Sequence, residues 1–170
     1  YSLDHYGSTY ILSGDYGQIA MSTDGCATWS APGYFQLSNS LIYNITNVPG
    51  TGKYWAVGRA FPFGSTTKQI MYSSNGGSNW TTYNAGVVAD FTSISMINEN
   101  TGYISGTNNR VMKTTDGGAS WVAKTGPSPV ATSQIYTCDF IDENTGWVFV
   151  NFSSLSGGNI FKTTNGGDNW

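Results

Sequence analysis

The sequence of 170 residues is poor in charge and has no long apolar run. Charged residues make up 10% of the chain. Its few lysines and arginines, seven in all, form no basic stripe that could neutralise a phosphate backbone. No segment approaches the roughly 20 consecutive apolar residues that a membrane-spanning helix needs. We therefore expect neither a nucleic-acid partner nor a membrane span.

Cysteine is also scarce. The two cysteines, Cys26 and Cys138, fit neither the spacing of a metal site nor a disulfide framework. We interpret both as packed, free thiols, with a disulfide between them as the alternative.

The chain is rich instead in aromatic residues, at 15%, and in glycine, with 22 residues. This balance favours short strands joined by tight turns. One eight-residue unit occurs four times, with the pattern Ser/Thr, Ser/Thr, Asp/Asn, Gly, Gly/Cys, two variable residues and Trp. Its copies span residues 22–29, 73–80, 114–121 and 163–170. They recur at intervals of roughly 40 to 50 residues, a period that indicates a repeat architecture.

A short apolar run precedes each unit, and the division into strands is clearest in the third repeat. Alternation and turn residues there predict strands at 91–97, 103–106 and 110–114, and a fourth strand that begins at Trp121. Four short antiparallel strands per repeat are typical of one β-propeller blade. We predict an all-β propeller with blades at approximately 1–33, 34–84, 85–125 and 126–170. These are about four blades of a presumed six to eight.

The last unit ends at Trp170, where a fourth strand is expected to begin. An open arc of about four blades would expose the apolar outer walls of its first and last blades, which soluble proteins rarely leave uncovered. We expect further blades of the same chain, or a second copy, to cover these walls.

The eight-residue unit is predicted to be structural. Its third residue can hydrogen-bond backbone N–H groups of its own turn, while its glycines accept positive φ angles. The third residues are Asp24, Asn75, Asp116 and Asn165. Since two of the four lack a charge, a metal-binding or acid/base role is disfavoured. The eighth residues, whose rings we expect to be buried between neighbouring strands, are Trp29, Trp80, Trp121 and Trp170.

These units resemble the Asp-box, or BNR, repeats of sialidases, xyloglucanases, sortilin-type receptors and photosystem II assembly-factor-like proteins. Segments 99–106 and 111–121, and likewise 142–147 and 160–167, are most similar to the assembly-factor-like group. The resemblance covers all four repeats, and it implies the propeller fold and a structural unit. It implies much less about function, because one fold serves many functions.

Catalysis is poorly supported by the residues present. Resemblance to a sialidase would require an arginine triad, and the chain has only Arg59 and Arg110. Resemblance to a xyloglucanase would require two catalytic aspartates at a suitable separation, and no aspartate lies in a matching motif. The turn at 142–146 has the spacing of a calcium loop, but its counterpart at 98–102 lacks the first carboxylate, which favours a plain β-turn. We predict no catalytic residue, cofactor or metal, with half of a propeller glycoside hydrolase as the alternative.

The most promising binding residues lie at the end of the blades opposite the eight-residue units. The loops between second and third strands share this end with the connections to the next blade, and they vary most in length. Aromatic side chains beside an arginine are typical of a binding surface. The candidates are Tyr34, Phe35, Arg59, Phe61, Phe63, Tyr83 and Phe152. We predict a scaffold or binding module for a protein or glycan, and the Asn/Ser/Thr/Gly-rich composition favours an extracellular or periplasmic location.

Overall fold

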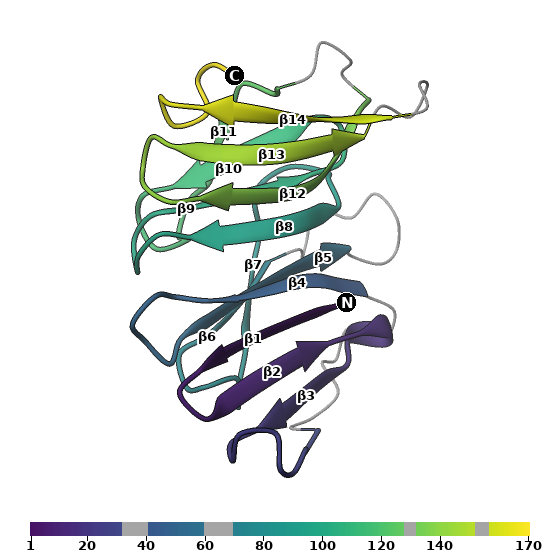
Figure 1. Cartoon of the computed structure of the whole chain (residues 1–170), viewed down its shortest axis with the longest axis vertical. Coiled ribbons are helices and arrows are strands. Elements are labelled where there is room, and N and C mark those ends of the chain that lie inside the picture. Colours follow the sequence, from purple (N-terminus) through teal and green to yellow (C-terminus); the bar gives the residue numbers. More distant parts are fainter. Residues whose placement is uncertain (32–40, 60–69, 128–131, 152–156) are drawn as a thin grey trace. The chain divides into compact units, whose positions relative to one another are not determined.

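The computed structural model describes residues 1–31, 41–59, 70–127, 132–151 and 157–170 (Figure 1). Within them, fourteen strands form four antiparallel sheets, and each strand pairs with its neighbours in sequence. The same residues contain one short 3-10 helix, η1, at Asp15–Gly17, and they include no helix long and apolar enough to cross a membrane. The prediction of an all-β chain with propeller-type sheets is confirmed.

We number the sheets in chain order. The first contains β1 (Ser2–Tyr6), β2 (Thr9–Ser13) and β3 (Ile19–Ser22). The second contains β4 (Leu41–Asn47), β5 (Tyr54–Arg59), β6 (Ile70–Ser73) and β7 (Thr81–Tyr83). The third contains β8 (Phe91–Met96), β9 (Gly102–Gly106), β10 (Arg110–Thr114) and β11 (Val122–Lys124). The fourth contains β12 (Gln134–Phe140), β13 (Gly146–Asn151) and β14 (Gly158–Thr163). In the third sheet, the predicted strands agree with the observed ones to within one residue.

The chain divides into two compact units, Tyr1–Val88 and Ala89–Trp170. Each unit contains two sheets that pack face to face, and each has its own core between them. The first unit holds the first and second sheets, and the second unit holds the third and fourth.

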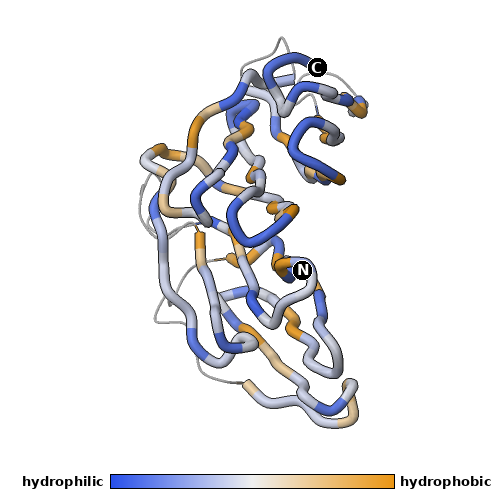
Figure 2. Tube along the Cα trace, turned by 90° about the vertical axis from the view of Figure 1, so that its left-hand side faces the viewer, coloured by the Kyte–Doolittle hydropathy of each residue, from blue (hydrophilic) through white to orange (hydrophobic). Residues whose placement is uncertain are grey.

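The pairing register is the same in all four sheets. The first residue of each eight-residue unit lies opposite the start of the second strand, in the pairs Ser22–Tyr10, Ser73–Tyr54, Thr114–Gly102 and Thr163–Gly146. Side chains alternate between the two faces of a strand, so this register places equivalent residues on the same face of every sheet. Hydrophobic residues recur at intervals along the chain trace, separated by hydrophilic and intermediate ones (Figure 2).

In the first unit, the second sheet fills most of the space between the two sheets. The first sheet contributes Ile11 and Ile19. The second sheet contributes Ile42, Ile45, Tyr54, Ala56 and Met71. The hydroxyl of Tyr54 crosses to the first sheet and donates a hydrogen bond to the carbonyl oxygen of Thr9 at 3.3 Å.

Two polar contacts join these sheets as well. A carboxylate oxygen of Asp4 accepts a hydrogen bond from the backbone N–H of Asn47 at 2.5 Å. The hydroxyl oxygen of Ser2 accepts one from the backbone N–H of Ile45 at 3.2 Å. Side chains of β1 thus hydrogen-bond to the backbone of β4, the first strand of the second sheet.

In the core of the second unit, an aromatic ring of the third sheet packs on a ring of the fourth sheet. Tyr103 stacks on Phe140 with centroids 3.5 Å apart and an interplanar angle of 4°. Its hydroxyl donates a hydrogen bond to the carbonyl oxygen of Glu143 at 2.7 Å, and burial raises the pKa of Tyr103 to about 12. The fourth sheet adds Cys138, whose thiol is buried and free, with its pKa raised by burial to about 11. The prediction of a packed thiol is confirmed for Cys138.

The second unit repeats the polar contacts of the first. The hydroxyl oxygen of Ser95 accepts a hydrogen bond from the backbone N–H of Phe140 at 3.0 Å. The hydroxyl of Ser93 donates one to the carbonyl oxygen of Cys138 at 3.3 Å. The register makes these serines equivalent to the two side chains that join the sheets of the first unit. Both sheet pairs are therefore held in the same way.

The second core depends on a glycine. A Cβ atom at Gly146 would lie 2.3 Å from the ring of Phe140. We predict that Gly146→Ala lowers the free energy of unfolding by about 1 to 3 kcal/mol, because the ring must leave its stacked position. Gly14→Ala is the matched control, since Gly14 is extended, with φ of −149°, and has no heavy atom within 4 Å of its Cβ position. Denaturant unfolding measures both, and an equal change in the two variants would contradict the prediction.

Candidate functional site

We call the four eight-residue units, at 22–29, 73–80, 114–121 and 163–170, the box turns. In each, the side-chain oxygen of the third residue accepts a hydrogen bond from the backbone N–H of the seventh, at 2.9 to 3.0 Å. The hydroxyl oxygen of the first residue accepts a hydrogen bond from the backbone N–H of the fifth residue, at 2.8 to 3.0 Å. The N–H of the fourth residue bonds to the turn between the first two strands of the same sheet. The predicted role of the third residue is confirmed.

The choice between Asp and Asn at the third position follows the seventh residue. Asp24 also accepts a hydrogen bond from the hydroxyl of Thr28 at 2.6 Å, and Asp116 accepts one from the hydroxyl of Ser120 at 2.5 Å. In the other two box turns both positions are asparagine. The Thr28 hydroxyl and N–H lower the pKa of Asp24 to about 2. The Ser120 hydroxyl and N–H likewise lower the pKa of Asp116. These interactions stabilise charged carboxylates that serve their own turns.

The tryptophans of the box turns differ in burial. Trp121 is 8% exposed, as predicted. Trp80 and Trp170 are half-buried against the cores of their units, and the indole N–H of Trp170 donates to the carbonyl oxygen of Thr125 at 2.8 Å. The prediction is wrong for Trp29, which is 44% exposed. Trp80 and Trp170 pack on cores shared with the sheet before their own, and no described sheet precedes the first.

The fifth residue of the box turn is likewise covered by a preceding sheet in the second box turn and exposed in the first. Gly77 has φ of 86°, and a Cβ atom there would lie 2.3 Å from Cδ1 of Ile11 in the preceding sheet. Cys26 occupies this position in the first box turn, with φ of 74°. Its thiol is free and exposed. The prediction of a packed thiol is therefore wrong for Cys26, because no preceding sheet among the described residues covers it.

Two of the predicted binding residues lie in the described part of the chain. Arg59 ends β5, and Tyr83 ends β7 in the same sheet. The half-buried ring of Tyr83 lies 5.5 Å from that of Trp55 and 6.5 Å from that of Tyr72, between centroids. Tyr83 thus belongs to an aromatic cluster of its own sheet. The other candidates, Tyr34, Phe35, Phe61, Phe63 and Phe152, lie outside the described residues.

The turn at 142–146 has a structural use for its aspartate. Asp142 accepts hydrogen bonds from the backbone N–H groups of Asn144 and Thr145, both at 2.7 Å, and these bonds lower its pKa. Asn98 accepts equivalent bonds in the turn at 98–102, at 2.9 and 2.8 Å. An uncharged residue therefore performs the same role, which agrees with a β-turn.

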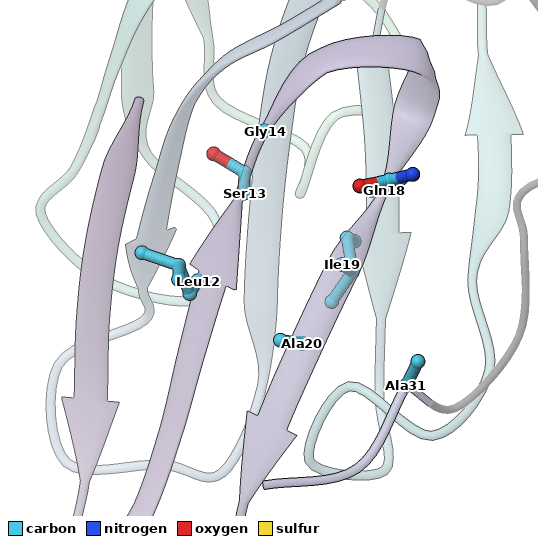
Figure 3. Close-up of a pocket in the computed structure, with 7 residues that line it drawn as sticks. All are labelled: Leu12, Ser13, Gly14, Gln18, Ile19, Ala20 and Ala31. Carbon is cyan, nitrogen blue, oxygen red and sulfur yellow. The ribbon is translucent and has the colours of Figure 1, made fainter.

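A pocket that the sequence did not indicate lies on the first sheet (Figure 3). Its volume is about 300 Å³, and its lining residues are Leu12, Ser13, Gly14, Gln18, Ile19, Ala20 and Ala31. The pairing of Leu12 with Ala20 places both on the face opposite Ile11. At the position of Leu12, the other sheets carry buried residues. The repeat pattern therefore gave no sign that the side chain of Leu12 is accessible.

Comparison with known proteins places the chain in a family. Residues 73–170, more than half of the chain, match the family model described as photosynthesis system II assembly factor YCF48. The chain belongs to this family. The matched part of this YCF48-family chain begins at the second box turn and includes the third and fourth sheets. A search of curated proteins finds no match.

Several solved propeller structures share the fold of this chain. YCF48 from Cyanidioschyzon merolae is similar with a TM-score of 0.67 and 14% identity, over 97% of this chain and 53% of that one. A YCF48 bound to a D1 peptide is similar with a TM-score of 0.59 and 11% identity, over 99% of this chain and 64% of that one. A GH74 xyloglucanase from Xanthomonas campestris has a TM-score of 0.72 and 13% identity, over 98% of this chain and 28% of that one. These identities establish the fold alone, and the chain spans less than two thirds of either YCF48 structure.

The unequal burial of the tryptophans predicts unequal contributions to stability. Trp121→Ala should lower the free energy of unfolding by about 3 to 5 kcal/mol, as is typical of buried aromatic truncations. Trp29→Ala should lower it by less than about 1 kcal/mol, because much of its ring already contacts water. Urea unfolding of both variants at a concentration where the chain is monomeric gives the comparison. Similar losses in the two would contradict the burial described above.

The low pKa values of Asp24 and Asp116 predict acid-sensitive stability. A carboxyl group whose folded pKa lies below its unfolded value contributes stability above the unfolded pKa, and this contribution is lost as pH falls through the folded pKa. For Asp24 the window runs from about 4, its usual value, down to about 2.

The double variant Asp24→Asn/Asp116→Asn tests this, because the two natural asparagine box turns show that the turn tolerates the amide. Its free energy of unfolding should fall less between pH 5 and pH 2.5 than that of the unchanged chain. Denaturant titrations at the two pH values measure the difference. Equal acid sensitivity of both proteins would rule out a contribution from these carboxylates.

Proposed function

We propose that this chain is a non-catalytic, protein-binding module of propeller type that acts in an extracellular or periplasmic setting. The observation that carries the proposal is the difference between the two ends of its sheets. One end is closed by the box turns, whose polar groups bond to one another in the same pattern four times. The opposite end receives the connections that differ most from one repeat to the next.

We call this opposite end of each sheet its loop face. Taken over the four sheets, the loop faces receive the connections at 30–41, 59–70, 83–91, 124–134 and 151–158, which contain all the predicted binding residues. Because successive strands of a sheet run in opposite directions, these connections leave the sheets away from the box turns. Variable loops on a fixed framework are where binding residues concentrate.

A protein partner is favoured over a glycan by the family. One solved YCF48 structure is described as bound to a D1 peptide. That ligand belongs to that protein, and its relevance here is that a related propeller binds a polypeptide. A glycan at the loop face is the alternative partner, and the tests below distinguish the two.

The carboxyl groups support binding rather than hydrolysis. A glycoside hydrolase of the common type pairs a carboxyl group of raised pKa with a second carboxylate. All ten acidic residues lie in the described part of the chain. Six aspartates hydrogen-bond to groups of the fold itself: Asp4, Asp15, Asp24, Asp116, Asp142 and Asp168. Each resolved carboxyl pKa shift is downward. The alternative of half a glycoside hydrolase is supported by the likeness of fold to a GH74 xyloglucanase.

The proposal is tested by a photo-crosslinking amino acid placed at position 61 of the loop face or at position 78 of the second box turn. In extracts of the producing organism, position 61 should give adducts with a defined protein, and position 78 should not. Equal labelling at both positions would count against the loop face. Recovery of the chain with the cytoplasmic fraction would contradict the proposed location.

The identified partner then allows a quantitative test. The double variant Phe61→Ser/Phe63→Ser should weaken binding at least about tenfold, since truncation of aromatic anchors has effects of this size or larger. Ser78→Ala serves as the matched control on the box turns, and both variants should melt like the unchanged chain. Unchanged affinity in the double variant would refute this site. Binding to a glycan array that the same variant abolishes would favour the glycan instead.

A further inference from the structure

The turn between β2 and β3 holds a tyrosine in a backbone conformation that tyrosine rarely adopts. The backbone N–H of Gln18 donates a hydrogen bond to the carbonyl oxygen of Asp15 at 3.0 Å, which closes the turn. Between them, Tyr16 has φ of 54° and ψ of 28°, and Gly17 has φ of 69°. Positive φ is common for glycine, but for a bulky residue it is a genuine outlier. Tyr16 is therefore the strained residue of this turn.

The third sheet builds the same turn from residues that suit it. By register, Asn108 is equivalent to Tyr16, and its φ is 59°. The residue after it, Asn109, has φ of 54°. Asparagine tolerates this conformation because its short polar side chain can hydrogen-bond locally. The fold thus does not require a tyrosine at this position.

The side chain of Tyr16 gains little from the fold in return for this strain. The residue is 65% exposed. Among the described residues, no hydrogen bond or ring contact to its side chain is present. The turn between Gly14 and Gln18 leaves the first sheet at its loop face (Figure 3). A strained residue that contributes little packing indicates a role outside the fold.

The residue before Tyr16 presents a negative charge. Oδ1 of Asp15 accepts a hydrogen bond from the hydroxyl of Tyr1 at 2.7 Å. In the described part of the chain, no ion pair involves Asp15, and no hydrogen bond is donated to its Oδ2. A carboxylate has about four acceptor sites. The Tyr1 hydroxyl therefore orients the Asp15 carboxylate and leaves most of these sites available.

A second sheet adds a further ring beside Tyr1. The centroids of the Tyr1 and Tyr43 rings lie 5.9 Å apart, with an interplanar angle of 69°. Tyr43 is the extra residue of a β-bulge in β4, where the pairing register shifts between Ile42 and Asn44. Bulges redirect side chains and are common next to functional sites. The first and second sheets thus bring aromatic rings and a carboxylate together at their loop faces.

We propose that this cluster, which we call the Asp15 cluster and which contains Tyr1, Asp15, Tyr16 and Tyr43, binds an arginine side chain of a partner protein. A guanidinium is planar and always charged, hydrogen-bonds a carboxylate through two N–H groups and stacks on aromatic rings. The cluster offers both kinds of contact, and the net charge of −3 on the chain favours a cationic ligand. The inference rests on the proposed function, because it assigns the chemistry of the partner at the loop face of the first sheet.

The test is an amide NMR titration of the full chain with the peptide acetyl-Gly-Arg-Gly-amide. We expect saturable shifts at residues 14–18 and 43, with a Kd on the order of 1 to 10 mM, as suits a contact with one side chain. The equivalent turn at 106–110 should not shift. A peptide with citrulline in place of arginine has the same shape without the charge. It should bind at least about tenfold more weakly, because the charge-assisted hydrogen bond is lost.

Variants of the cluster separate binding from folding. Asp15→Asn should weaken binding of the arginine peptide at least about tenfold. Asp139→Asn is the matched control, since it removes one charge from an exposed aspartate of β12 and should leave binding unchanged.

Tyr16→Asn should have opposite effects on binding and on stability. Binding should weaken about three- to fivefold, the effect of one exposed cation–π contact. The melting temperature should rise by about 2 to 4 °C, because asparagine suits the turn. A lower melting temperature would show that the ring supports the fold, and it would count against the proposal.

Three further results would overturn the proposal: no saturable shift at residues 14–18, equal affinity for the arginine and citrulline peptides, or equal affinity of Asp15→Asn and the unchanged chain. The peptide comparison uses the unchanged chain, so it decides the question even if a variant fails to fold. A null titration with intact adducts at position 61 would overturn the arginine site alone. Missing adducts with a positive titration would instead contradict the proposed function at position 61 alone.

Discussion

Each sheet of this chain has apolar side chains on both faces, and the need to cover both is the constraint on which the rest of the structure depends. Consecutive residues of one strand show it: Tyr54 and Trp55, on opposite faces of the second sheet, are both fully buried. A single sheet of this kind cannot form a core, and stacking on a neighbour is the means by which repeat proteins do so.

The two observed sheet pairs meet this constraint with different residues. In the first unit, the following sheet supplies the large ring, Tyr54, which faces the smaller Ile11. In the second unit, the preceding sheet supplies it, because Tyr103 stands at the position of Ile11 and Gly146 at that of Tyr54. Phe140 then occupies the space beside Gly146 and stacks on Tyr103. Such exchange of volume across an interface is tolerated as long as the total is kept.

Function in such a fold is expected where the repeats differ rather than where they agree. The polar groups of each box turn bond to one another and to the adjacent turn of the same sheet. The pattern is the same where asparagine occupies the position of Asp24, as Asn75 does in the second box turn. The loop face has no such repeated bonding pattern among the described residues. The YCF48 family assignment fits this division, since one framework can present different loops to different partners.

The sequence by itself determined the repeat period, the strands of the third repeat, the hydrogen bonding of the box turns and the end of the sheets at which Arg59 and Tyr83 lie. These features depend on alternation and turn chemistry within a few residues, so they are local. Only the tertiary structure decided which equivalent residues are buried. Trp29 and Trp121 have the same local sequence role, as do Leu12 and Val148, yet one of each pair is exposed. Burial depends on whether another sheet covers the position, and neither the repeat nor its period contains that information.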